Sequence, residues 1–299
     1  MKFQNPKGIL SVIFVYGIIF SEYYVFVFHY LPYRYNNNNS LSTIFIVIEF
    51  TLIYLMIHWA YIQAQIQSPG HPSPHLANNY QEHTLQEIKN RTKKHSEIIQ
   101  KKRKQKLMKK YELAIDEEDE IFDIIQAIQL DSYCFKCQNV KQPRTHHCKE
   151  CNKCILRMDH HCPWVNNCIG MNNHRFFCQF IFYALLCMSQ CFIFITIELL
   201  GDTQLKANSK FLCQICAFTC LLLCLSMGTL LAFHLYHIAK NITTVEFHIE
   251  EMKTDNPFQK SKIIDNFKEL FGSDYIYWIL PLTDNLSNKT KIRNDSFEL

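Results

Sequence analysis

Few residues in this chain interrupt regular structure, since only 7 glycines and 9 prolines occur among 299 residues. Charged residues are also few, at 19% of the chain, and the formal net charge at pH 7 is only +4. The apolar residues make up 48% of the chain, and they are gathered in long blocks instead of being spread as in a soluble core. The composition therefore favours an integral membrane protein.

Four apolar runs are each long enough to cross a bilayer, which takes about 20 helical residues. They cover residues 9–31, 41–62, 176–200 and 211–238. Lys2 and Lys7 precede the first run, as in a signal peptide, but the run is too long and no small-residue cleavage site follows. We therefore predict an all-α membrane protein with four transmembrane helices, the first of them retained.

The basic residues indicate how these helices are oriented. The N-terminus, the polar stretch 63–175 and the C-terminal tail hold 2, 18 and 8 of the 31 lysines and arginines, whereas the turns 32–40 and 201–210 hold 1 and 2. The positive-inside rule then places both termini and the polar stretch in the cytosol. We expect a multi-pass protein of an endomembrane (Golgi or ER) or of the plasma membrane.

Half of the 14 cysteines lie in one short segment, where they alternate with histidines. Three Cys-x-x-Cys steps occur there: Cys134/Cys137, Cys148/Cys151 and Cys151/Cys154. Such steps bring two thiolates to one tetrahedral zinc, and they make a poor disulfide framework. Two structural zinc sites need eight ligands, and the seven cysteines with His147 and His161 offer nine, so one cysteine is left over.

The sequence Asp159-His160-His161-Cys162 stands inside this Cys-rich segment. With the spacing around it, the segment resembles the DHHC-type protein S-acyltransferases, or palmitoyltransferases. The resemblance includes a Thr-Thr-x-Glu motif, an Asn-Pro-Phe…Asn…Phe-Gly element and the four-helix plan. These motifs stand at residues 243–246 and 256–272. One departure is His174, where the family more often has an aromatic or other residue.

The resemblance implies a role for each matching residue. Cys162 would be the nucleophile that accepts the acyl group, His160 its base, and Asp159 the residue that orients His160. The family's interleaved ligation would give one zinc to Cys134, Cys137, His147 and Cys154, and the other to Cys148, Cys151, His161 and Cys168. Protein ligands fill both sites, so we interpret them as structural.

The resemblance also implies the substrates. A fatty acyl-CoA, palmitoyl-CoA, would donate the acyl group, and cytosolic or membrane proteins with juxtamembrane cysteines would accept it. Candidates to bind the CoA phosphates are the basic residues among the zinc ligands, for which surface solubility is the alternative. They are Arg144, Lys149, Lys153 and Arg157. We predict a protein-cysteine S-palmitoyltransferase with an S-acyl-enzyme intermediate; the alternative is a non-catalytic zinc-binding membrane adaptor.

Several features outside the Cys-rich segment allow more than one interpretation. The linker carries 11 basic residues between Lys89 and Lys110, which suits either contact with the lipid bilayer surface or a solvated helix; binding of nucleic acid is disfavoured.

Glu22 and Glu49 lie within the first two apolar runs, and we expect that they either face the bundle interior or form a functional site. Cys213-x-x-Cys216 is interpreted as packing. The Thr-Thr-x-Glu motif either docks on the active site or caps a helix.

We expect five segments along the chain. They are an N-terminal tail with two helices (1–62), a charged linker (63–133), the zinc domain (134–175), two further helices (176–238) and a C-terminal region (239–299).

Overall fold

The computed structural model describes residues 6–37, 40–72, 133–134, 136–137, 139–201, 206–249 and 256–283. These residues are mostly helical, and four helices among them are long and apolar enough to span a membrane. The four spans are Gly8–Tyr35, Leu41–Ile66, His174–Leu200 and Ala207–Ala239. The prediction of a helical protein with four transmembrane helices is therefore confirmed. The basic run between Lys89 and Lys110 lies outside the described residues.

The chain divides into two compact units, one of Met1–Gly70 with Met158–Leu299 and one of His71–Arg157. The larger unit contains all four spans. Its first span combines α1 (Pro6–Val25), a π-helical turn η1 (Phe26–Tyr30) and α2 (Leu31–Asn37). The others are α3 (Ser40–Ile66), α6 (His174–Leu200) and α7 (Ala207–Ala239).

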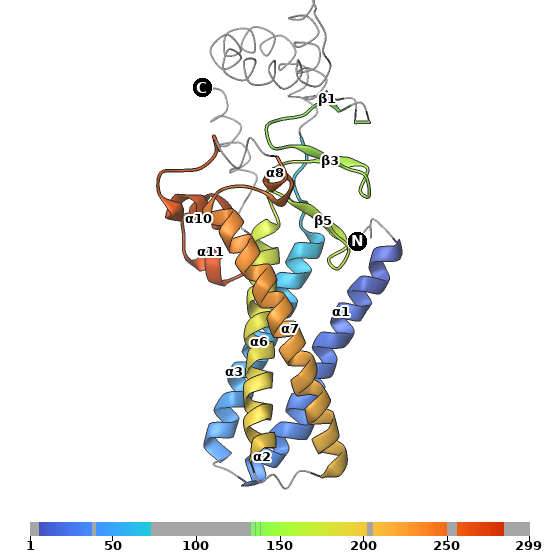
Figure 1. Ribbon diagram of the computed structural model, residues 1–299, viewed down its shortest axis with the longest axis vertical. Helices are drawn as coiled ribbons and strands as arrows, with labels where there is room; N and C mark the ends of the chain where they lie inside the picture. The colour runs from blue at the N-terminus through green and yellow to red at the C-terminus, as the bar shows by residue number, and fades with distance from the viewer. Residues whose placement is uncertain are drawn as a thin grey trace, which may run out of the picture. The chain divides into compact units, whose positions relative to one another are not determined.

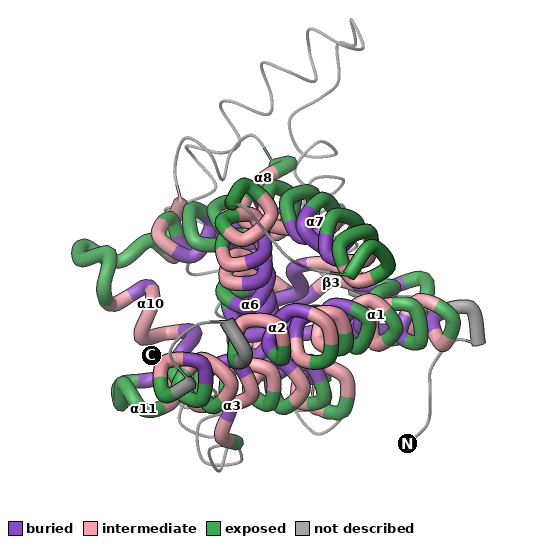
Figure 2. Tube along the Cα trace, turned by 90° about the horizontal axis from the view of Figure 1, so that it is seen from below, coloured by how far each residue is buried: buried purple, intermediate pink, exposed green. Residues whose placement is uncertain are grey.

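Helix α6 is the centre of the bundle, where it packs on both α3 and α7 (Figure 1). In its spanning stretch 44% of the residues are buried, compared with 22%, 17% and 22% in the other three spans, and the contrast is visible in Figure 2. Apolar side chains such as Phe14, Ile48 and Phe218 remain exposed on the outer helices. A helix that is apolar all round suits a lipid environment, so these faces would contact the bilayer.

The core of the bundle continues into the segment that carries the Asp-His-His-Cys sequence. Cys162 and Val165 belong to the same buried cluster as Tyr61 and Phe180, whose rings stack at 4.6 Å between centroids. A site at Cys162 is therefore built on the ends of α3 and α6.

Among the residues that the structure describes after α7 there are three short helices: α8 (Thr244–Phe247), α10 (Ile263–Phe271) and α11 (Ile276–Ile279). The buried side of α10 packs Leu270 and Phe271 on Ile238 at the end of α7 and on Cys178 of α6. Asn266 fixes this contact, since its amide donates to Ala239 O at 2.8 Å and its carbonyl accepts from Lys260 N at 2.9 Å. The C-terminal element is thus anchored to the helix bundle.

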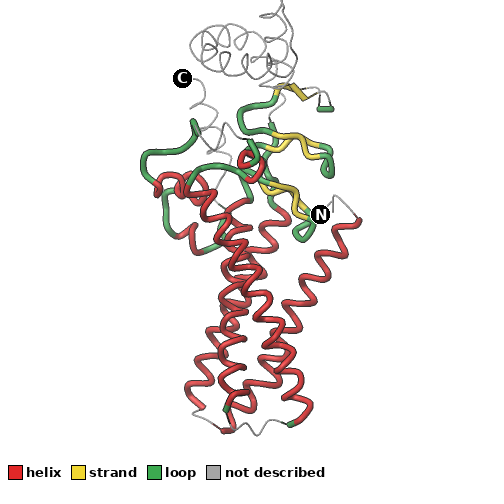
Figure 3. Tube along the Cα trace, viewed as in Figure 1, coloured by secondary structure: helices red, strands yellow, loops and turns green. Residues whose placement is uncertain are grey.

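The Cys-rich segment adds three two-stranded antiparallel sheets to the helical fold, drawn in yellow in Figure 3. The pairs are β1 (Tyr133–Cys134) with β2 (Asn139–Val140), β3 (His146–Cys148) with β4 (Lys153–Ile155), and β5 (His160–Cys162) with β6 (Asn167–Ile169). Asn152 and Asn166, in the last two hairpin turns, adopt left-handed conformations with φ of 50° and 53°, which asparagine tolerates. β1 to β4 lie in the smaller unit and β5 with β6 in the larger.

Candidate active site and metal centres

The β5–β6 hairpin brings the three predicted catalytic residues together. Asp159 precedes β5 and is held by a backbone hydrogen bond from its N–H to Ile169 O at 2.9 Å. His160 and Cys162 are the first and last residues of β5. The Asp159 side chain is fully buried, Cys162 is 5% exposed, and the His160 side chain is 27% exposed. His160 is thus the most exposed of the three side chains.

Asp159 holds the His160 ring in one orientation. His160 Nδ1 lies 2.7 Å from Asp159 Oδ2. An ionised carboxylate only accepts hydrogen bonds, so Nδ1 carries the proton and Nε2 is left as the basic nitrogen. Cys162 stands two residues after His160 on β5, and it helps to raise the pKa of His160. The order Asp, His, Cys is that of an activated thiol nucleophile.

The pKa values of Asp159 and His160 are both shifted in the direction that favours their charged forms. Burial opposes ionisation of Asp159, but His174, the hydrogen bond from His160 and His234 outweigh burial and hold the pKa of Asp159 well below its usual value. Burial would lower the pKa of His160, yet Asp159 and Cys162 raise it to about 9. Asp159 is therefore ionised at neutral pH, and it favours the protonated form of His160, so that a proton taken from the thiol would be held on His160.

The Thr-Thr-x-Glu motif does both things that its sequence allowed. Thr243 and Glu246 form a reciprocal capping box at the start of α8, with N–H to side-chain oxygen distances of 3.2 and 2.8 Å. Thr244, between them, donates to Asp159 twice, from its N–H to Oδ1 at 3.0 Å and from its hydroxyl to Oδ2 at 2.9 Å. The cap thus presents Thr244 to the Asp159 carboxylate.

Side-chain amides that the sequence did not single out anchor the hairpin to α3. Asn167 Nδ2 donates to the carbonyls of Ala64, Gln65 and Gln67 at 2.9–3.2 Å, so it satisfies acceptors at the C-terminal end of that helix. Asn173 Nδ2 donates to Ala64 O at 3.3 Å as well. A polar Asn within an otherwise apolar stretch, as at Asn167, was the available signal for these contacts.

A glycine near the start of α1 lets the same hairpin approach closely. A Cβ at Gly8 would overlap the side chain of Asn166, the residue at the hairpin turn. On the far side, Tyr61 of α3 donates its hydroxyl to Trp164 O at 2.6 Å. The β5–β6 hairpin is therefore fixed by α1 and α3 together.

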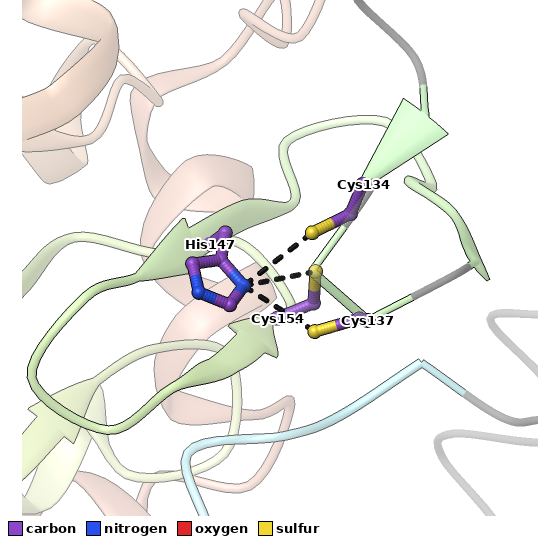
Figure 4. Close-up of side chains that lie close together, drawn as sticks. All are labelled: Cys134, Cys137, His147 and Cys154. Carbon is purple, nitrogen blue, oxygen red and sulfur yellow. Dashed lines mark hydrogen bonds between the residues drawn. The ribbon is translucent and has the colours of Figure 1, made fainter.

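The first predicted metal set is assembled within the smaller unit (Figure 4). His147 and Cys154 face each other across the β3–β4 pair. His147 Nδ1 lies 3.3 Å from Cys137 Sγ, 3.4 Å from Cys134 Sγ and 4.0 Å from Cys154 Sγ. Three thiolates and one imidazole at these separations fit a tetrahedral zinc, whose bonds measure about 2.0–2.3 Å.

The second predicted set is divided between the two units, and its assembly stays a prediction. In the larger unit, His161 and Cys168 face each other across β5 and β6, with 3.6 Å between Nδ1 and Sγ. In the smaller unit, Cys148 Sγ accepts a hydrogen bond from Cys151 N at 3.4 Å, as in a tight Cys-x-x-Cys turn.

The basic residues proposed for the CoA phosphates differ in exposure. Lys149 and Lys153 are exposed, Arg144 is half-buried and Arg157 is 4% exposed. Two of them, Arg144 and Arg157, have left-handed backbones with φ of 66° and 44°. Their binding role stays a prediction.

The acidic residues of the first two spans face other helices. Glu22 accepts hydrogen bonds from Cys216, Thr219 and Cys220 of α7. Glu49 Oε1 accepts one from Gln190 of α6 at 2.8 Å. Glu22 is 5% exposed and therefore faces the bundle interior, as the first interpretation supposed, whereas Glu49 is exposed and does not.

A helix bundle with four candidate membrane spans that carries a buried carboxylate, a histidine and a thiol on one hairpin is compatible with a class of membrane-bound enzymes that use a cysteine nucleophile. Residues 128–251 match the family described as DHHC palmitoyltransferase. The chain is also similar to named relatives over most of its length. Human palmitoyltransferase ZDHHC20 is 28% identical over 95% of this chain and 76% of its own.

Two zebrafish (Danio rerio) proteins are similar to the same extent. Palmitoyltransferase ZDHHC20-A is 30% identical over 95% of this chain and 77% of its own length. Palmitoyltransferase ZDHHC2 is 31% identical over 93% of this chain and 74% of its own length. The chain therefore belongs to the DHHC palmitoyltransferase family. The predictions of an acyltransferase and of a membrane protein are confirmed.

Proposed function

We propose that the protein transfers a fatty acyl group from acyl-CoA to cysteine side chains of other proteins, and that Cys162 carries the group between them. The observation that supports this most is the buried Asp159 carboxylate, which lies 2.7 Å from His160 Nδ1, so that Nε2 is the ring nitrogen left for the thiol of Cys162 on the same strand. The adaptor alternative needs none of these contacts.

The reaction has two steps, each assisted by His160. In the first, His160 Nε2 takes the proton of the Cys162 thiol, and the sulfur attacks the thioester carbon of acyl-CoA. The bond to the CoA sulfur breaks, and His160 returns the proton to that leaving group. In the second, a substrate cysteine gives its proton to His160 and attacks the S-acyl enzyme, which restores the Cys162 thiol. Ping-pong kinetics follow.

The place of Cys162 suits a lipid substrate. Its side chain belongs to the apolar cluster that continues along α3 and α6 with Phe177 and Ile181. An acyl chain gains about 0.8 kcal/mol for each CH2 that leaves water. The tail would therefore lie among the helices while the thioester stays at their end beside His160. Lys149 and Lys153 are the exposed candidates for the CoA phosphates.

Both Cys/His sets would hold structural zinc. Each supplies three thiolates and one imidazole, so the coordination is closed and the ion supplies cross-linking, not reaction chemistry. In the second set, His161 and Cys168 would pin β5 to β6, and the neighbouring residues His160 and Cys162 would keep their places. The topology that suits this scheme has both termini and the Cys-rich segment in the cytosol, with substrates that carry juxtamembrane cysteines.

The test is incorporation of labelled palmitoyl-CoA into the purified protein, with bound zinc counted in parallel. Cys162→Ser should abolish the hydroxylamine-labile label and keep the zinc. Cys224→Ser, which changes a half-buried cysteine of α7 outside the site, should keep both. Label that persists in Cys162→Ser would show that another residue accepts the acyl group, and absence of label in the wild-type protein would favour the adaptor.

A further inference from the structure

Two histidines that the proposed reaction does not use lie next to the Asp159 carboxylate. His174 is the first residue of α6 and His234 lies in the last turns of α7, and each is 1% exposed. His174 Nε2 lies 3.2 Å from His234 Nδ1, which lies 4.0 Å from Asp159 Oδ2. One ligand atom from each of the three residues lies within 4.8 Å of the others. Three separate elements thus direct metal-binding atoms at one point.

The separations are those of ligands around one ion. A tetrahedral ion with bonds of about 2.0–2.1 Å sets neighbouring donors roughly 3.3 Å apart. In the first Cys/His set (Figure 4), His147 Nδ1 lies 3.3, 3.4 and 4.0 Å from the three cysteine sulfurs. The distances from His234 Nδ1 are similar, at 3.2 Å to His174 Nε2 and 4.0 Å to Asp159 Oδ2. Two imidazoles and one carboxylate are a usual donor set for zinc and other divalent first-row ions, with a position left for water.

The surroundings of His234 also suit an ion. The rings of Phe177 and Phe233 meet the His234 ring nearly at right angles, with centroids 5.2 and 5.6 Å away. Such an apolar shell limits water access and strengthens the bonds between an ion and its ligands. The His160 ring, 5.8 Å from that of His234 and partly exposed, marks the side from which an ion would enter.

We propose that Asp159, His174 and His234 form a further metal site, which takes a divalent first-row ion such as Zn²⁺ and inhibits acyl transfer when filled. The inhibitory part rests on the proposed function. Asp159 Oδ2 accepts the hydrogen bond of His160 Nδ1 at 2.7 Å. An ion bound to that oxygen takes the carboxylate away from His160, so the base loses the contact that orients it.

Metal binding is measured first, in the full-length Cys162→Ser protein, whose reactive thiol cannot serve as a ligand. Zn²⁺ is added to protein that retains its Cys-bound zinc, and bound ions are counted after removal of free metal. We expect one ion per chain beyond those already present. His174→Phe and His234→Phe should each abolish that ion and keep the Cys-bound zinc, which shows that they are folded.

A matched control separates this site from other histidines. His237 lies one turn further along α7 and is also buried, but it is not part of the cluster. His237→Phe should still bind the additional ion. Absence of an additional ion in the parent protein, or an equal amount in His174→Phe, would overturn the site.

Inhibition is measured second, in protein with Cys162 intact and with buffered free Zn²⁺. Each variant is normalised to its own rate at the lowest free zinc. The zinc concentration for half inhibition should rise about tenfold or more in His174→Phe, because one of three ligands is lost, and should stay the same in His237→Phe. Equal inhibition of His174→Phe and wild type would place the inhibitory ion on Cys162 instead. Because the binding assay needs no catalysis, failure of the proposed function would leave its outcome intact.

Discussion

Loss of the Thr244 hydroxyl tests how the Asp159 carboxylate is held. Thr244→Val removes the hydrogen bond to Oδ2 at 2.9 Å and keeps both the β-branched shape and the N–H bond to Oδ1 at 3.0 Å. A hydrogen bond to a charged group contributes about 1.5–3 kcal/mol. Since each 1.36 kcal/mol is tenfold in rate, acyl-enzyme formation should slow by roughly 10- to 150-fold.

The assay is single-turnover acylation by labelled palmitoyl-CoA, quenched at short times, with zinc content and thermal unfolding measured on the same samples. Thr244→Ser is the matched control, because it restores a hydroxyl at the same position and should recover most of the rate. Acylation of Thr244→Val at the wild-type rate, or an equally slow Thr244→Ser, would refute the role of this hydrogen bond.

Three further changes have defined outcomes. Cys137→Ser should lower the zinc content by about one ion per chain and lower the melting temperature, because a closed site loses a ligand; unchanged zinc would exclude Cys137 as a ligand. Asp159→Asn should slow acylation by at least about a hundredfold. Because the carboxylate that raises the pKa of His160 is gone, the pH optimum of acylation should also move to lower pH. An unchanged pH profile would contradict this. Asn266→Ala should destabilise the protein by about 1–3 kcal/mol, since the buried Asn266 side chain makes two hydrogen bonds that are lost, and denaturant unfolding with wild-type stability would speak against that anchor.

The sequence predicts the helices of this protein well, because an apolar run of membrane length has few other stable structures. The three small sheets were not predicted. Strands of two or three residues show no alternation of apolar and polar positions, and their turns depend on the left-handed backbones of Asn152 and Asn166.

The contacts around Asp159 show which part of a site a single sequence leaves open. Thr244 lies 85 residues further along the chain, and its motif alone allowed either a helix cap or docking on the active site. The structure has both, since Thr243 and Glu246 form the cap. His234 gave no signal, because a lone histidine in an apolar helix acquires its meaning only from His174, which lies 60 residues away.

The most direct test of the account is a chase of the acyl group from the enzyme. Protein labelled by palmitoyl-CoA is freed of unreacted donor and then mixed with a peptide that carries one cysteine beside an apolar segment. We predict that label on Cys162 passes to the peptide at least as fast as steady-state turnover. Label that stays on Cys162 while the peptide is acylated from fresh acyl-CoA would contradict an S-acyl enzyme as the intermediate.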